Sequence, residues 1–242
     1  MKRIILTSLM CLFAAGTAFS QVDYDTYKAG QKDFKIALLG HSSLLFEYED
    51  LVIYIDPWTN VTDFKGLPKA DLILITHEHA DHFDKKAINL ISTENTDFIV
   101  SAAVEEELGY GEVMKNGDKT TFENFTIQAV PAYNIKHERS AGQPYHPKGR
   151  GNGYLITVND FTVYVGGDTE NIPEMDALSG KVTVAFLPKN LPYTMDDEMF
   201  IDAAKRIKPR FLYPYHYSEF DKEKIRSVLS EARIRLRFPE GK

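Results

Sequence analysis

Short apolar runs separated by turn residues dominate the chain after about residue 35. Residues 35–39, 44–47 and 52–55 alternate or run apolar between short turns, as the strands of a meander do. Residues 154–158 and 161–165 repeat the pattern around an Asn-Asp pair, which favours a hairpin. The sequence therefore predicts antiparallel strands in both halves of the chain.

Two other stretches join strands to helices. Residues 71–76 form a nearly continuous apolar run, typical of a strand buried on both faces, and residues 84–91 then show helical spacing. Residues 194–197 read as a capping box for a helix that ends near residue 207, and residues 210–213 follow as a strand. Each half thus has strands followed by a helix, with no linker between the halves, and we expect one domain.

A histidine-rich motif lies between the predicted strand and helix, where residues 77–82 read His-Glu-His-Ala-Asp-His. The motif holds three of the seven histidines in the chain. Imidazole nitrogens and carboxylate oxygens are the ligands of zinc-like ions, and loops at the carboxyl ends of strands commonly bind ligands in α/β proteins. We predict a metal site that includes His77, His79, Asp81 and His82.

This motif resembles the His-x-His-x-Asp-His signature of the metallo-β-lactamase superfamily. Further matches follow the same chain order, with Gly-His-Ser-Ser at 40–43, Asp-Pro-Trp at 56–58, Gly-Gly-Asp-Thr at 166–169 and Pro-Tyr-His-Tyr at 214–217. The resemblance covers residue 35 to the C-terminus. It implies a four-layer αβ/βα sandwich with a one- or two-metal site between its sheets. The nearest branch holds an ascorbate-6-phosphate lactonase and the phospholipase D that cleaves N-acyl-phosphatidylethanolamines.

The resemblance also implies the remaining ligands, Asp168 and His216. A carboxylate has two oxygens, so Asp168 could bridge two cations. Two arrangements stay open at this point. In the first, one ion is held by His77, His79 and a third group, a second ion is held by Asp81, His82 and His216, and Asp168 bridges them. In the second, a single ion is held by Asp81, His82, Asp168 and His216.

Two further residues are expected to support the ligands rather than to bind metal. Asp56 follows a predicted strand and precedes a proline, so it is either an ordinary turn residue or the acceptor of a hydrogen bond from a metal-bound histidine. The resemblance favours the second interpretation. It implies a similar supporting place for His41.

One segment departs from the family pattern. Members with two metals supply another histidine after a strand that here spans residues 125–130, but Asn134 stands at that place. An amide oxygen is a weaker zinc ligand than imidazole, so the sequence leaves two interpretations open, an incomplete site or one filled by a different residue. His137 and His146 are the other candidates. His146 lies in a loop bounded by proline and glycine, and could be a ligand, a substrate contact or a proton donor.

The N-terminus has the layout of a secretory signal peptide. Lys2 and Arg3 make residues 1–3 a positive n-region, residues 4–15 form an apolar h-region, and Ala-Phe-Ser at 18–20 precedes Gln21. The alternative is a membrane anchor, but the apolar stretch is shorter than the roughly 20 residues that span a bilayer. We expect a signal peptide over residues 1–20, a hydrolase domain over residues 21–242, no stable membrane anchor, and a periplasmic or secreted protein.

Loss of that peptide changes the composition. It removes the single cysteine and two basic residues, leaving 26 basic against 35 acidic residues. Disulfides, thiolate ligands and a cysteine nucleophile are then excluded. An acidic balance also argues against a nucleic-acid substrate, because phosphate backbones are held largely by Lys and Arg. We expect a small-molecule substrate.

The motifs together favour a hydrolase whose nucleophile is a metal-bound hydroxide, with Asp81 and Asp168 at the catalytic centre. The chain has neither a Gly-x-Ser-x-Gly elbow nor a Gly-rich phosphate loop. Zinc is the expected ion, with manganese or nickel as alternatives, and the expected substrate is a small ester, lactone or phosphodiester. The alternatives are a β-lactamase, or a metal- or ligand-binding protein in which Asn134 marks a degenerate site with little turnover.

Overall fold

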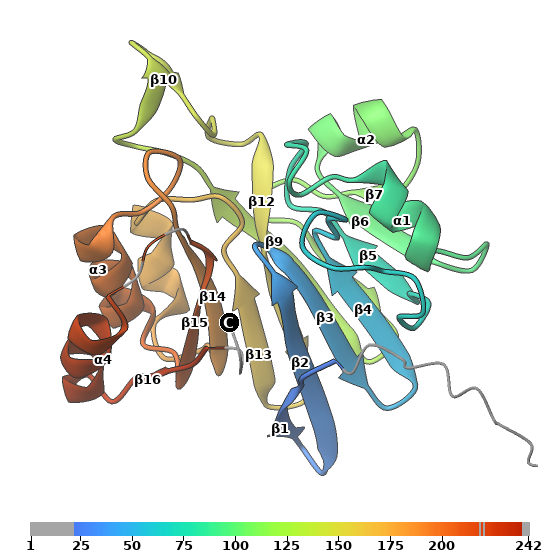
Figure 1. Cartoon of the computed structure of the whole chain (residues 1–242), viewed down its shortest axis with the longest axis horizontal. Coiled ribbons are helices and arrows are strands. Elements are labelled where there is room, and N and C mark those ends of the chain that lie inside the picture. The colour runs from blue at the N-terminus through green and yellow to red at the C-terminus, as the bar shows by residue number, and fades with distance from the viewer. Residues whose placement is uncertain (1–21, 218, 220, 239–242) are drawn as a thin grey trace, which may run out of the picture.

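The computed structural model describes residues 22–217, 219 and 221–238 (Figure 1). The predicted signal peptide lies outside these residues. Among the helices of the described residues, none is long and apolar enough to cross a membrane.

Two seven-stranded sheets are formed by the described residues, and the first follows the order of the sequence. The strands from the first to the fourth pair antiparallel, and those from the fourth to the seventh pair parallel. Its strands are β1 (Asp25–Ala29), β2 (Lys32–Gly40), β3 (Ser43–Tyr48), β4 (Leu51–Ile55), β5 (Leu72–Leu74), β6 (Asp97–Val100) and β7 (Glu112–Val113).

The second sheet repeats this plan in the order β16-β15-β14-β13-β12-β9-β8. The strands from β8 to β13 pair antiparallel, and those from β13 to β16 pair parallel. Its strands are β8 (Lys119–Phe122), β9 (Phe125–Ala132), β12 (Gly151–Val158), β13 (Phe161–Val165), β14 (Val184–Lys189), β15 (Phe211–Tyr217) and β16 (Arg235–Leu236).

Aromatic side chains fill the space between the sheets. Phe34 and Phe46 from the first sheet, with Phe161 and Phe186 from the second, are buried in one cluster. The rings of Phe34 and Phe161 approach to 4.9 Å between centroids across the two sheets. Because side chains alternate along a strand, the other residues of each strand face outward and need a second covering layer.

Helices provide that layer on both sides, as Figure 1 shows. Phe200, Ala203, Ala204 and Ile207 recur at helical spacing and are buried against the second sheet. The order helix, sheet, sheet, helix confirms the predicted αβ/βα sandwich. The first sheet carries α1 (Lys85–Ile91) and α2 (Ala102–Leu108), and the second carries the 3₁₀ helix η1 (Pro173–Leu178), α3 (Asp197–Ile207) and α4 (Lys222–Glu231).

The predicted cap of α3 was wrong by two residues. Asp196 is the N-cap, and its carboxylate accepts a hydrogen bond from the backbone N–H of Met199 at 2.8 Å. The Thr194 hydroxyl instead accepts from the backbone N–H of Asn190 at 2.8 Å, which closes the preceding turn. An aspartate two residues closer to the apolar stripe replaces Thr194 as the cap.

A small hairpin completes the fold. It consists of β10 (Glu138–Ser140) and β11 (Gln143–Pro144), which pair antiparallel and project from the body of the protein (Figure 1). Hairpin residues line the same pocket as the histidine-rich loop. The hairpin therefore forms one wall of the candidate site.

Candidate metal centre

The histidine-rich loop is anchored at both ends. On one side β5 is fully buried, and on the other Asp84 caps α1 by accepting from the backbone N–H of Lys86 at 2.8 Å. The second oxygen of Asp84 accepts from the backbone N–H and the hydroxyl of Thr59, at 2.8 and 2.6 Å. These contacts hold residues 77–82 as a tight turn between strand and helix.

The structure brings the predicted residues together as two four-residue groups, each with ligand atoms within 4.8 Å of one another. In the first group, His79 Nδ1 lies 3.1 Å from His77 Nε2 and 3.3 Å from His146 Nε2. Asp168 Oδ2 lies 3.2 Å from His146 Nε2. His146 thus stands in the position for which the sequence left a third ligand open.

The second group contains His41, Asp81, His82 and His216. Asp81 Oδ2 lies 2.9 Å from His41 Nε2 and 3.3 Å from His216 Nε2. His41 was expected to support a ligand, but its ring nitrogen points at the same carboxylate oxygen as the predicted ligand His216. It is therefore a fourth candidate ligand.

Asp168 lies between the two groups. Its Oδ1 is 3.3 Å from His82 Nε2, and its Oδ2 is 3.5 Å from His216 Nε2 as well as close to His146. The preceding Gly167 has φ +65°, and a Cβ there would lie 2.8 Å from the Asn152 carbonyl oxygen. Glycine is required at position 167 because no side chain fits this approach.

Two buried polar atoms at this junction, His82 Nε2 and Asp168 Oδ1, face each other at 3.3 Å as an ion pair, and neither makes a hydrogen bond within the described residues. Burying such groups without a hydrogen bond is costly, and each is an atom that can bind a metal. Nitrogen and carboxylate oxygen donors without sulfur suit zinc, manganese or nickel. The residues present therefore fit divalent ions in both groups.

The pKa shifts of His82 and His77 show that the centre attracts a cation and also contains a neutral imidazole. Burial would lower the pKa of His82, but the carboxylates of Asp168 and Asp56 outweigh it and raise that pKa well above its usual value. Burial lowers the pKa of His77 well below its usual value, with a further contribution from His82. His77 is thus available as a neutral ligand, while the carboxylates beside His82 attract a cation.

Asp56 and Thr76 orient His82. Asp56 is fully buried, and its Oδ2 lies 2.7 Å from His82 Nδ1. The same carboxylate accepts from the backbone N–H and the hydroxyl of Thr76, at 2.8 and 2.6 Å. With Nδ1 engaged in this way, Nε2 of His82 is directed at Asp168. This is the contact that the sequence suggested for Asp56.

Asn134 is not among either group of candidate ligands, although its position suggested one. Its Oδ1 accepts from the backbone N–H and from Nδ1 of His146, both at 2.8 Å. Its Nδ2 donates to Glu170 Oε1 at 2.9 Å and to the carbonyl of Tyr193 at 2.8 Å. Both partners of Nδ2 are oxygens that can only accept, so the orientation of the Asn134 amide is fixed. Its Oδ1 can then only accept from the His146 ring, and His146 must carry its proton on Nδ1. Its Nε2 lone pair then faces the first group.

His137, the other candidate, is also engaged elsewhere. Its Nδ1 lies 2.7 Å from Glu170 Oε1, and its backbone N–H donates to the same oxygen at 2.8 Å. The second oxygen of Glu170 accepts from the backbone N–H of Ile135 and Lys136. Burial would raise the pKa of Glu170, but these hydrogen bonds, led by the one from Asn134, lower it. Sequence reasoning missed Glu170, whose one signal is its position two residues after Asp168.

Three residues of the centre adopt left-handed backbone conformations that are uncommon for residues other than glycine. The φ angles are 49° at His41, 46° at Asp56 and 48° at His216. Such conformations cost free energy and occur preferentially at functional sites. Here each follows a strand or lies near its end, and turns the side chain toward the centre.

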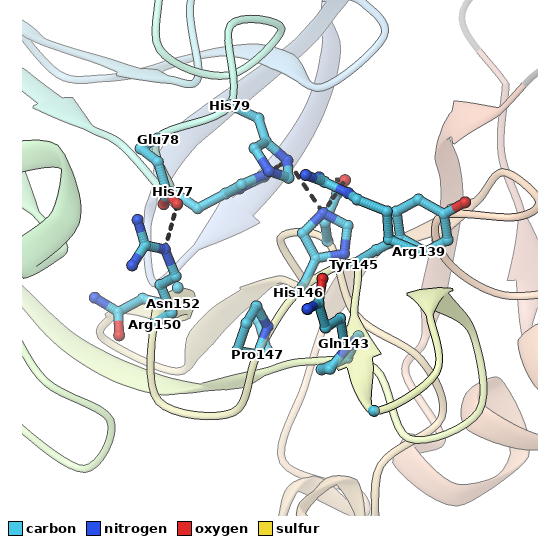
Figure 2. Close-up of a pocket in the computed structure, with 15 residues that line it drawn as sticks. His77, Glu78, His79, Arg139, Gln143, Tyr145, His146, Pro147, Arg150 and Asn152 are labelled. Carbon is cyan, nitrogen blue, oxygen red and sulfur yellow. Dashed lines mark hydrogen bonds and ion pairs between the residues drawn. The ribbon is translucent and has the colours of Figure 1, made fainter.

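Two pockets meet over the two groups. The larger has a volume of about 530 Å³ and the smaller about 370 Å³. Figure 2 shows His79, His146, Tyr145 and Arg139 around the larger pocket, opposite Arg150 and Glu78. Five residues line both pockets: His79, Arg139, Tyr145, His146 and Asp168. A space of this size accommodates a small molecule directly against the candidate ligands.

Fold and centre together define a class of protein, a sandwich of two α/β halves with paired His/Asp metal-binding groups at the strand ends. Residues 35–216 match the family described as the beta-lactamase superfamily domain, and the chain belongs to that family. It is 30% identical over 195 residues to a metal-dependent hydrolase of Nanoarchaeum equitans, with 76% of this chain and 84% of that protein covered.

Solved structures agree with this assignment. A candidate metal-dependent hydrolase from Parabacteroides distasonis is 40% identical, with a TM-score of 0.86 over 91% of this chain and 99% of that chain. The metallo hydrolase Igni18 of Ignicoccus hospitalis is 25% identical, with a TM-score of 0.71 over 86% and 95% of the two chains. The protein is a metal-dependent hydrolase of the metallo-β-lactamase type.

Proposed function

We propose that this protein is exported and hydrolyses a small ester, lactone or phosphodiester with two divalent ions, zinc being the expected metal. The observation that carries the proposal is Asp168, whose two oxygens lie 3.2 Å from His146 of the first group and 3.3 Å from His82 of the second. A carboxylate in this place can bridge two ions. The first arrangement from the sequence is therefore preferred, with His146 as the third histidine of its site.

When bound, divalent ions lower the pKa of a coordinated water toward neutrality and polarise the scissile group. The protein's own contribution is to supply three imidazoles and one ionised carboxylate to each group. Burial opposes ionisation of Asp81, but hydrogen bonds from His216 and His41 outweigh it and hold its pKa well below the usual range. Asp81 is consequently an anion at every pH at which the protein would act.

The walls of the pockets support water as the attacking group. Neither pocket is lined by a serine or a cysteine within the described residues. Tyr145 and Tyr193 pack edge to face with ring centroids 5.0 Å apart and provide an aromatic side to the cleft. Such a cleft suits a small substrate with an apolar part.

The alternative of a degenerate site rested on Asn134. The geometry gives this alternative no support, because His146 supplies an imidazole to the first group and Asn134 orients it. The other alternative, a β-lactamase, is distinguished by including the β-lactam nitrocefin among the substrates assayed.

The test is a joint measurement of metal content and turnover. Mature protein loaded with zinc would be assayed on bis(4-nitrophenyl) phosphate, a simple lactone and nitrocefin, alongside protein stripped with chelator. We expect metal-dependent turnover of the phosphodiester or the lactone. Loaded protein that holds two ions per chain but turns over none of a broad ester, lactone and phosphodiester panel would contradict the proposal.

A further inference from the structure

The side chain of Arg139 lines both pockets of the cleft. It lies on β10, in the projecting hairpin, and it is the one lysine or arginine that lines both pockets within the described part of the chain. The pockets share its side chain together with those of His79, His146 and Asp168. A positive charge therefore stands at the junction where a substrate would contact the candidate metal ligands.

An aromatic surface supports this guanidinium. Its carbon Cζ lies 5.8 Å from the centroid of the Tyr145 ring, and Tyr145 itself packs against Tyr193. Figure 2 shows Arg139 and Tyr145 together on the side of the pocket that holds His79 and His146. Stacking on a ring holds a guanidinium in place while leaving its N–H groups free to donate.

The neighbouring cations differ from Arg139 in having acidic partners. Arg150, across the pocket, forms an ion pair with Glu78, and Lys148 lies 2.7 Å from Glu174. No carboxylate of the described residues forms such a pair with Arg139. Its charge is unbalanced in a protein that carries a formal net charge of −7. The excess of acidic residues in the chain therefore does not explain why this one cation lies in the cleft without an acidic partner.

We propose that Arg139 forms a binding subsite for an anionic group of the substrate, a carboxylate or a phosphate that lies apart from the scissile bond. A guanidinium presents paired N–H donors that match the two oxygens of such a group. This inference rests on the proposed function and narrows its substrate to a small anionic ester, lactone or phosphodiester. Arg139 thus determines specificity, and the aromatic pair Tyr145 and Tyr193 positions it.

A binding experiment tests the subsite independently of turnover. Succinate and inorganic phosphate would be titrated calorimetrically into zinc-loaded protein, as wild type, Arg139→Met, Arg139→Lys and Lys148→Met. We expect Arg139→Met to lower the affinity for one of the two anions about tenfold. This is the value typical of a charge-assisted hydrogen bond at a partly exposed site. Arg139→Lys should recover part of the loss, and Lys148→Met, which removes a paired charge outside both pockets, should bind as wild type does.

The pattern of anions identifies the chemistry. If Arg139→Met loses affinity only for succinate, the substrate carries a carboxylate. If it loses affinity only for phosphate, the substrate carries a phosphate. Arg139 is exposed on a hairpin, so its variants should fold, and equal melting temperatures would verify this. Unchanged affinity for both anions in Arg139→Met would overturn the subsite.

A turnover experiment separates failure of the subsite from failure of the proposed function. The kcat/KM for mono-4-nitrophenyl succinate would be divided by that for 4-nitrophenyl acetate, and we expect this ratio to fall about tenfold in Arg139→Met, through a raised KM. If both esters react and the ratio does not change, the subsite is wrong and the hydrolase proposal stands. If neither ester reacts but anion binding depends on Arg139, the hydrolase proposal is weakened and the subsite stands.

Discussion

Replacing Asn134 by alanine should selectively weaken metal binding at the first group. The substitution removes the two contacts, both 2.8 Å, by which Asn134 Oδ1 holds the backbone N–H and Nδ1 of His146. It also leaves the Tyr193 carbonyl without the Nδ2 donor, whereas Glu170 keeps its other donors. His146 would then be free to rotate and to place its proton on Nε2.

The expected magnitudes follow from these contacts. A buried group left without its partner costs about 1–3 kcal/mol, so the free energy of unfolding should fall by about 2–4 kcal/mol. Loss of a group that orients a metal ligand typically reduces affinity about 10–100-fold. Asn134→Asp should be no milder, because its carboxylate would replace the amide that now lies 2.9 Å from Glu170.

Metal titration against a competing chelator would measure both sites. Wild type should hold two ions tightly, whereas Asn134→Ala should keep one and bind the second about 10–100-fold more weakly. Asn116→Ala is the matched control, since that amide donates to the carbonyls of Val130 and Gly151 and to the Asn152 side chain, with no candidate ligand side chain among its partners. Two ions bound with wild-type affinity by Asn134→Ala would refute the reasoning about His146.

Four further outcomes are expected. Elemental analysis of mature protein, purified without chelator and with metal supplied, should find divalent transition ions, zinc first, and less than about a tenth of an ion per chain would contradict the metal centre. Mass spectrometry of protein from the native host should place the N-terminus at or near Gln21, and an intact Met1 in a cytosolic fraction would argue against export. Asp168→Ala should reduce activity about a thousandfold or more, and His77→Ala should be comparably severe if both ions act, whereas near-normal activity in His77→Ala alone would point to a single ion. Asp84→Ala should lower the free energy of unfolding by about 1–2 kcal/mol, because it removes both the α1 cap and the two hydrogen bonds from Thr59. Burial would raise the pKa of Asp84, but these hydrogen bonds, led by those from Thr59, outweigh it and lower that pKa. The contribution is therefore present at neutral pH and disappears as the pH falls through the acidic range, which denaturant titrations at pH 7 and pH 3 would show.

Strong hydrophobic periodicity allowed much of the fold to be predicted. The meander strands, the hairpin of β12 and β13 and the helix α1 all occur where their patterns placed them. The strand predicted over residues 71–76 is shorter in the structure, spanning Leu72–Leu74. At its C-terminal end the backbone N–H of Ile75 still donates to Ile99 of the neighbouring strand, but the backbone N–H of Thr76 donates to Asp56 instead. A buried side chain distant in sequence ended the strand, and no local pattern reveals such a partner.

Weakly patterned elements could not be predicted. All three residues of β10 are exposed, so this strand has no apolar alternation, although its hairpin carries Arg139 into the cleft. The helix α2 has seven residues, three of them consecutive glutamates, and buries Ala103 and Val104. Short elements of this kind depend on tertiary contacts more than on their own sequence.

The histidine-rich loop was predictable because its candidate ligands follow one buried strand, whereas the sequence could name His146 only as one of several candidates with its role left open. His77, Asp168 and His216 all follow strands or lie near their ends, so the sheets fix their positions. His146 lies in a loop between the small hairpin and β12, where no strand fixes it. The hydrogen bonds from His146 to Asn134 and from Asn134 to Glu170 take over that task and link the loop to the segment that carries Asp168. We infer that Asn134, which occupies the position of the expected ligand, instead orients His146 so that His146 can bind metal. Disruption of this link should therefore weaken metal binding at the first group before the second.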